Sequence, residues 1–145
     1  MSKGYLFNIP AHGHINPSLP LVRELVRRGE QITYFTGATE QAKIASTGAE
    51  FRALPYDLSS FSRSPKSPEI DFLLFDCVLR CVPDLVEMGR REKPDYVIYD
   101  FVSPWGKVVA EQLGVPAIAL FPNPLPMRQT LPPPILFQMI DHLVP

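Results

Sequence analysis

The stretch Gly4-Tyr-Leu-Phe-Asn-Ile-Pro-Ala-His-Gly-His-Ile-Asn-Pro-Ser-Leu19 places a short apolar strand, a loop with two histidines and an Asn-Pro helix start in direct succession. The strand is expected over Tyr5 to Ile9. Asn16 is a favourable helix N-cap, and Pro17 fits the first helical turn. Gly13 is expected to let the backbone turn sharply and a ligand approach closely. The loop therefore follows the carboxyl end of a strand, the edge at which open α/β sheets bind ligands.

Strand and helix signals alternate along the rest of the chain. Short runs rich in β-branched and aromatic residues predict further strands. These strands are expected over Gln31 to Thr36, Phe51 to Leu54, Asp95 to Asp100 and Val115 to Phe121.

Periodic apolar residues bounded by capping residues predict the helices between these strands. The first helix ends at Gly29, and a short helix over Glu40 to Ser46 is capped by Thr39 and closed by Gly48. A long helix begins at about Glu69, and Pro83 is expected to kink or interrupt it. A further helix begins at Ser103 and Pro104 and is closed by Gly114, and a terminal helix is expected over Ile135 to Leu143. The alternation predicts an α/β fold, in which a parallel sheet carries helices on both faces.

Composition narrows the class of protein. The 145 residues suffice for one domain with a core, and the apolar fraction of 46% is ordinary for a globular domain. A net charge of −1 offers no basic footprint for nucleic acid. No apolar run is long enough to span a membrane, and the N-terminus lacks the layout of a signal peptide. A cytoplasmic location is the default expectation.

Proline marks the expected domain boundary. Seven of the 17 prolines lie between Pro122 and Pro145, which indicates an extended crossing segment or a linker. We therefore expect a domain over residues 1–121 and a Pro-rich segment with a terminal helix over residues 122–145. Pro55 to Pro68 is expected to form a long surface loop, a length often associated with function.

Two patterns exclude common ligands. Cys77 and Cys81 lie four residues apart in a helical pattern; metal ligation and a disulfide are both conceivable, but buried thiols packed as small apolar groups are the favoured interpretation. The turn from Pro10 to His14 is not the Gly-rich dinucleotide fingerprint, so bound NAD or FAD is not supported.

His14 and Asp100 are the candidate pair for chemistry. Asp100 ends one expected strand and His14 follows another, so a parallel sheet would bring both to one crevice. A carboxylate bonded to one imidazole nitrogen fixes the tautomer and leaves the other nitrogen to accept a proton. Two alternatives without a catalytic role stay open: His12 as a turn histidine, and Asp100 as a cap of the following segment.

The sequence from His12 to Gly29, His-Gly-His-Ile-Asn-Pro-Ser-Leu-Pro-Leu-Val-Arg-Glu-Leu-Val-Arg-Arg-Gly, resembles the N-terminal signature of UDP-sugar glycosyltransferases, notably the bacterial macrolide and flavonoid enzymes. A second match is Pro94-Asp-Tyr-Val-Ile-Tyr-Asp-Phe, followed by Gly106-Lys and Ala110-Glu-Gln-Leu-Gly-Val-Pro-Ala. Both matches lie in register, and the resemblance covers about Tyr5 to Phe121.

The resemblance implies an inverting, metal-independent transferase of GT-B architecture, with two Rossmann-like domains facing a cleft. The N-terminal domain of such enzymes binds the acceptor, and the C-terminal domain binds the UDP-sugar, which is a substrate rather than a cofactor. The family's catalytic histidine falls on His14 and its acidic partner on Asp100. His12 falls on a position that varies in the family and receives no catalytic role.

Acceptors of the family are apolar aglycones such as phenols, flavonoids or macrolides. Apolar residues near the sheet edge and the long loop are candidates for the acceptor pocket, although ordinary core packing is the alternative for each. These candidates are Ile9, Phe61, Phe72, Phe75 and Phe121.

The chain departs from the family because no donor-binding half is visible in it. We therefore expect a truncated piece: the acceptor-binding half of a hexosyltransferase that uses a donor such as UDP-glucose. It is expected to be inactive without the donor-binding half, which would be its partner and could be a second chain. The alternative is a non-catalytic acceptor-binding or scaffold module that needs a separate donor-binding subunit. A flavodoxin-like or response-regulator-like domain is a weaker third interpretation, because the acidic cluster of a receiver is missing.

Overall fold

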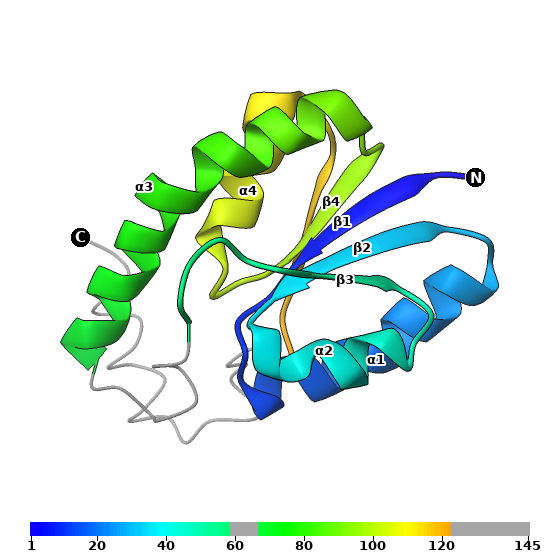
Figure 1. Cartoon of the computed structure of the whole chain (residues 1–145), viewed down its shortest axis with the longest axis horizontal. Coiled ribbons are helices and arrows are strands. Elements are labelled where there is room, and N and C mark those ends of the chain that lie inside the picture. Colours follow the sequence, from blue (N-terminus) through cyan, green and yellow to red (C-terminus); the bar gives the residue numbers. More distant parts are fainter. Residues whose placement is uncertain (59–66, 123–145) are drawn as a thin grey trace, which may run out of the picture.

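A computed structural model describes residues 1–58 and 67–122 of the chain. Within these ranges five parallel strands form one sheet in the order β3-β2-β1-β4-β5 (Figure 1). The strands are β1 (Lys3–Phe7), β2 (Gln31–Thr36), β3 (Glu50–Ala53), β4 (Tyr96–Asp100) and β5 (Ala117–Leu120). Because β1 lies between β2 and β4, residues that follow these three strands come together at the carboxyl edge.

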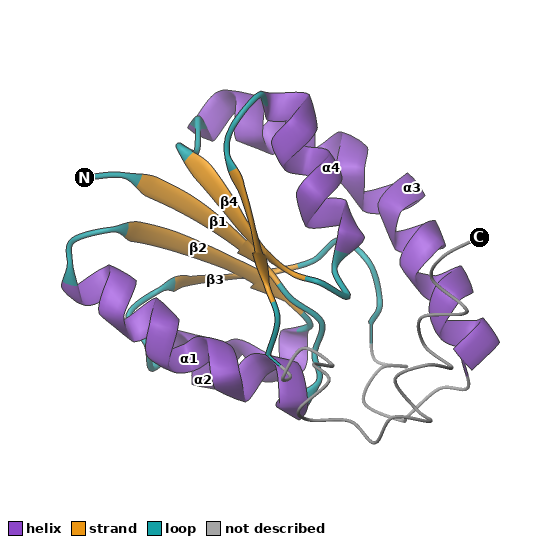
Figure 2. Ribbon diagram, turned by 180° about the vertical axis from the view of Figure 1, so that it is seen from behind, coloured by secondary structure: helices purple, strands orange, loops and turns teal. Residues whose placement is uncertain are grey.

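Helices cover both faces of the sheet, as the sequence predicts (Figures 1 and 2). One face carries α1 and α2, and the other carries α3 and α4. The helical elements are α1 (His12–Arg27), the 3₁₀ turn η1 (Ala38–Glu40), α2 (Gln41–Ala45), α3 (Ser67–Glu92) and α4 (Pro104–Leu113). The predicted α/β, Rossmann-like fold is therefore confirmed.

The core has two layers because successive side chains of a strand point to opposite faces. Leu6 of β1 packs in one cluster with Ile15 and Val22 of α1. Phe7 packs in the other cluster with Trp105 of α4 and Cys77 of α3. Strands buried on both faces read as continuous apolar runs, which explains the unbroken Tyr5-Leu-Phe pattern of β1.

Local sequence signals predicted the exact bounds of some elements. β2 has the predicted bounds, and α4 runs from Pro104 to Leu113 with Ser103 as its N-cap. Gly114 ends α4 in the left-handed conformation with φ of 69°, the conformation that favours glycine after a helix. β1, β3 and β5 are shifted or shortened by a few residues relative to the prediction, as is usual at element ends.

The predicted start of α1 is wrong. The helix begins at His12 with Ala11 as its N-cap, so Asn16 and Pro17 lie inside it. The backbone amides of His14 and Ile15 already donate to the carbonyl oxygen of Ala11, at 2.9 and 2.8 Å. The chain thus enters the helix four residues before the local capping signal.

One further helix prediction is wrong, and the prediction that Pro83 kinks or interrupts a helix is correct in only one of its two forms. Thr39 lies inside η1 and makes no capping hydrogen bond to the backbone. Pro83 does not interrupt α3, which is continuous from Ser67 to Glu92 and bends along its length in Figure 1, as a proline inside a helix favours. Most of the predicted loop, residues 59–66, and the predicted terminal helix at Ile135 to Leu143 lie outside the described residues.

Candidate functional site

The side chains of His14 and Asp100 meet at the carboxyl edge of the sheet. His14 lies in the first turn of α1, directly after the loop that follows β1, and Asp100 is the last residue of β4. Their Nδ1 and Oδ2 atoms are 2.9 Å apart, although 86 positions separate the residues in sequence. The parallel pairing of β1 with β4 produces this meeting, as the sequence analysis expects.

Burial and hydrogen bonding give the two partners different roles. Asp100 is fully buried, whereas 17% of the His14 side chain is exposed. The second carboxylate oxygen, Oδ1, accepts a bond of 2.9 Å from the backbone amide of Val102. A carboxylate only accepts hydrogen bonds, so this contact requires the tautomer of neutral His14 that carries its proton on Nδ1. Its Nε2 has no partner among the described residues and is the nitrogen free to take a proton.

A pair of exposed aromatic rings extends from the imidazole. The ring centroids of His14 and Phe101 are 5.8 Å apart, and Phe101 stacks on Phe121 with centroids 5.3 Å apart. Phe101 is 43% exposed and Phe121 is 51% exposed. Aromatic faces that remain exposed beside a polar group suit an apolar, ring-containing ligand.

Phe101 is absent from the sequence-derived candidates, whereas Phe121 is among them. A signal for Phe101 existed, because it directly follows Asp100 in the sequence and therefore had to lie at the same sheet edge. The apolar character of Phe101 does not by itself distinguish a residue that faces a ligand from a residue of the core.

The other acceptor candidates are not joined to the pair by any described contact. Ile9 is buried in the core on the α3 side of the sheet. Phe72 and Phe75 are exposed on α3, whose N-terminal half extends past the carboxyl ends of the strands in both ribbon views (Figures 1 and 2). Phe61 lies outside the described residues.

His12 and Gly13 differ from the pair they flank. The His12 side chain is exposed and makes no hydrogen bond within the described part of the chain. Gly13 lies in the first helical turn without a positive φ, so the expectation that it makes a sharp turn is wrong. A Cβ added to Gly13 would meet no atom of residues 1–58 and 67–122 within 4 Å.

Other groups of chemical interest lie elsewhere. Cys77 and Cys81 are buried free thiols with their Sγ atoms 3.4 Å apart, which confirms the prediction of buried packing. No cluster of three or more His, Cys, Asp or Glu side chains suited to a metal ion occurs in residues 1–58 and 67–122. None of the helices in these ranges is both long and apolar enough to cross a bilayer.

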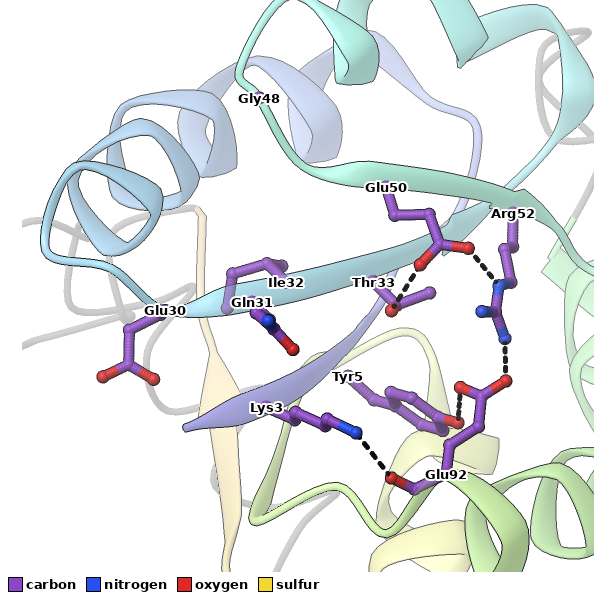
Figure 3. A pocket seen from close by; sticks show the side chains of 10 residues that line it. All are labelled: Lys3, Tyr5, Glu30, Gln31, Ile32, Thr33, Gly48, Glu50, Arg52 and Glu92. Carbon is purple, nitrogen blue, oxygen red and sulfur yellow. Dashed lines mark hydrogen bonds and ion pairs between the residues drawn. The ribbon is translucent and has the colours of Figure 1, made fainter. Parts of the chain in front are cut away.

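A recess of about 410 Å³ lies at the opposite, amino-terminal edge of the sheet (Figure 3). Its charged groups already bind one another: Arg52 donates to Glu50 and Glu92 at 2.8 and 2.6 Å, and the Tyr5 hydroxyl donates to Glu92 at 2.5 Å. Burial raises the pKa of Tyr5, and the bond to Glu92 raises it further. These pairs tie the end of α3 to β1 and β3, and we assign the recess no chemistry.

Known proteins similar to this chain are glycosyltransferases. The NDP-glycosyltransferase YjiC of Bacillus subtilis is 34% identical over 79% of the chain, and the oleandomycin glycosyltransferase of Streptomyces antibioticus is 33% identical over 81%. The chain spans 30% and 29% of the lengths of these relatives. No protein-family model matches the sequence.

Solved structures give the same result. The glycotransferase of kitacinnamycin superposes with a TM-score of 0.73 and 28% identity, and the calicheamicin glycosyltransferase CalG4 with 0.72 and 26%. These matches cover 97% and 98% of this chain but 34% and 37% of the solved chains.

Proposed function

From the similarity of this chain in sequence and fold to the N-terminal part of GT-B glycosyltransferases, we propose that it is the acceptor-binding, base-bearing part of an inverting UDP-sugar-dependent hexosyltransferase. The observation that carries the proposal is the 2.9 Å contact between His14 Nδ1 and the buried carboxylate of Asp100. The acceptor is an apolar aglycone with a free hydroxyl, such as a flavonoid, a phenol or a macrolide.

In the proposed reaction His14 is the general base. Its Nε2 takes the proton of the acceptor hydroxyl while the hydroxyl oxygen forms a bond to the anomeric carbon of the sugar. The bond from that carbon to the UDP oxygen breaks on the opposite face, so the configuration inverts and UDP leaves with the electron pair. Asp100 holds Nδ1–H and stabilises the imidazolium that forms.

The stacked rings of Phe101 and Phe121 form the proposed wall against which the aglycone lies beside His14. Burial of an aromatic face against such rings supplies binding energy without hydrogen bonds. Phe72 and Phe75 of α3 remain proposed contributors farther out in the same site, whereas Ile9 is buried in the core and is not proposed to contact the acceptor.

The donor-binding half is the proposed partner. The chain spans about 30% of the length of the relatives it matches. In the proposed enzyme the UDP-sugar is bound mainly by the donor-binding half, on the same polypeptide or on a second chain. One alternative function is a non-catalytic acceptor-binding module that recruits a donor-binding subunit.

The test begins with intact mass analysis of the purified protein under denaturing conditions, which detects a second polypeptide. The same protein is then incubated with UDP-glucose and either a flavonoid or oleandomycin, and the glucoside is measured by chromatography with mass detection. If glucoside forms, His14→Ala is expected to lower its rate by about 10²–10⁴-fold, the usual contribution of a general base.

His12→Ala is the matched control, because it removes a histidine two positions away that has no bond to Asp100. Equal rates for wild type and His14→Ala would contradict the assignment of His14 as base. If the 145-residue chain binds a flavonoid but forms no product even when a donor-binding half is supplied with UDP-glucose, the binding-module alternative is supported.

A further inference from the structure

A buried hydrogen-bonded cluster lies directly beneath the turn that carries His14. It consists of Asn8, which follows β1, Tyr34 of β2 and Ser18 of α1, all three without solvent exposure. Asn8 Nδ2 donates to the carbonyl oxygen of His14 at 3.1 Å and to the hydroxyl of Tyr34 at 2.9 Å. Asn8 Oδ1 accepts from the backbone amide of Ile9 at 2.8 Å.

The direction of every bond in this cluster follows from counting hydrogens. The Ser18 hydroxyl donates its single hydrogen to the carbonyl oxygen of Ile15 at 2.7 Å. The contact of 2.7 Å between Ser18 Oγ and Tyr34 Oη therefore uses the Tyr34 hydrogen. Burial raises the pKa of Tyr34 to about 12, so this hydroxyl keeps its hydrogen at neutral pH. Both amide hydrogens of Asn8 are also used, so the cluster is directional and fully satisfied.

The turn that these bonds hold is short of backbone hydrogen bonds. Pro17 and Pro20 lie inside α1 and have no N–H, so they cannot donate to the carbonyls of Gly13 and Asn16 four positions earlier. The carbonyls of His14 and Ile15, in the same turn, receive buried side-chain donors from Asn8 and Ser18. Both donors meet at one atom, the hydroxyl oxygen of Tyr34.

We propose that Asn8, Ser18 and Tyr34 are positioning residues for His14, with the Tyr34 hydroxyl as the hub that holds the first turn of α1 where Nδ1 reaches Asp100. This inference rests on the proposed role of His14 as base. Fully satisfied buried networks specify one arrangement, and a base must lie within hydrogen-bond reach of the proton it takes. The cluster therefore contributes to the reaction without touching either substrate.

The test measures the imidazole itself and needs no turnover. The chain has only three histidines, so nitrogen-15 NMR resolves their ring nitrogens, and the His14→Gln variant identifies the signals of His14. In the wild type at mildly alkaline pH, His14 is expected to hold its proton on Nδ1. Tyr34→Phe removes only the hub hydroxyl and is expected to abolish this fixed tautomer, leaving a mixture.

Tyr5→Phe is the matched control. It removes a hydroxyl from the adjacent strand, where the bond runs to Glu92 at the other edge of the sheet. Both variants are expected to lower the thermal midpoint, as any lost buried hydrogen bond does, but only Tyr34→Phe is expected to alter the His14 nitrogens. Ser18→Ala, which removes the second bond of the hub, serves as the test if Tyr34→Phe does not fold.

A fixed Nδ1–H tautomer that survives in Tyr34→Phe or, where that variant does not fold, in Ser18→Ala would overturn the inference and leave the proposed base intact. A wild-type chain without this tautomer would overturn the His14–Asp100 pair and the inference together. The two failures are therefore distinguishable.

Discussion

At the scale of single residues, the site depends on one carboxylate that serves two neighbours. Asp100 accepts from His14 with one oxygen and from the backbone of Val102 with the other. The capping role and the partner role, which the sequence presents as alternatives, thus coexist in one side chain. Capping fixes the carboxylate while burial strengthens its bond to the imidazole, so the first role supports the second.

Phe101 offers a test of the acceptor wall. Phe101→Ala is expected to raise the dissociation constant of a flavonoid about 2–10-fold, because an aromatic contact contributes about 0.5–1.5 kcal/mol beyond area burial. Isothermal titration calorimetry on the chain measures this change. The control is Leu21→Ala, which removes an exposed apolar side chain of α1. Equal affinities of wild type and Phe101→Ala would exclude Phe101 from the wall.

At the scale of elements, capping and periodicity predicted those helices whose ends are set locally. α4 was predictable because Ser103, Pro104 and Gly114 act within their own turns. The start of α1 was not predictable, because the turn that carries His14 is held by Asn8, which follows β1 and lies outside the helix. The capping signal at Asn16 therefore does not set the start of the helix, because tertiary hydrogen bonds stabilise an earlier start.

Glu92 joins three elements and gives a pH dependence. The last residue of α3, it accepts hydrogen bonds from Tyr5 of β1 and Arg52 of β3. Burial raises the pKa of the Glu92 carboxyl, but these hydrogen bonds outweigh burial, so the pKa is lowered overall. A carboxyl whose pKa is lower in the folded state contributes stability above its unfolded pKa of about 4.3 and loses it as pH falls further.

We therefore expect the free energy of unfolding to fall as pH drops from about 5 to 3, with a smaller slope in Glu92→Gln. Urea unfolding at a series of pH values measures the slope. Glu87→Gln removes an exposed carboxylate from the same helix and should keep most of the wild-type slope. If the free energy of unfolding had the same pH dependence in wild type and Glu92→Gln, the proposed contribution of Glu92 would be refuted.

At the scale of the whole molecule, the two edges of the described sheet differ in character. β3 carries Glu50 and Arg52, which pair with each other, and charged side chains protect an edge strand from pairing with other chains. β5 has only Ala, Ile and Leu, and Ile118 is 52% exposed. Apolar residues on both faces are typical of strands that are covered on both faces.

The apolar β5 edge of the described sheet is expected to make the chain self-associate as its concentration rises. Ile118→Glu places a charge at this edge and should weaken association about tenfold or more, because like charges would then oppose each other. Sedimentation velocity over a concentration series measures the effect, and circular dichroism checks the fold. Leu21→Glu is the control at an exposed position on α1. A wild-type chain that stays monomeric throughout would contradict the expectation.

Sequence alone determined the alternation of strands and helices, the caps of α4 and the residues that can exchange a proton, because hydrogen bonding within a turn and side-chain periodicity act over a few positions. Tertiary structure alone decided that β1 lies beside β4, that Phe101 rather than Ile9 faces the imidazole, and that Tyr34 holds the turn of His14. These contacts join residues up to 92 positions apart, and only the packing of helices onto both sheet faces brings such residues together.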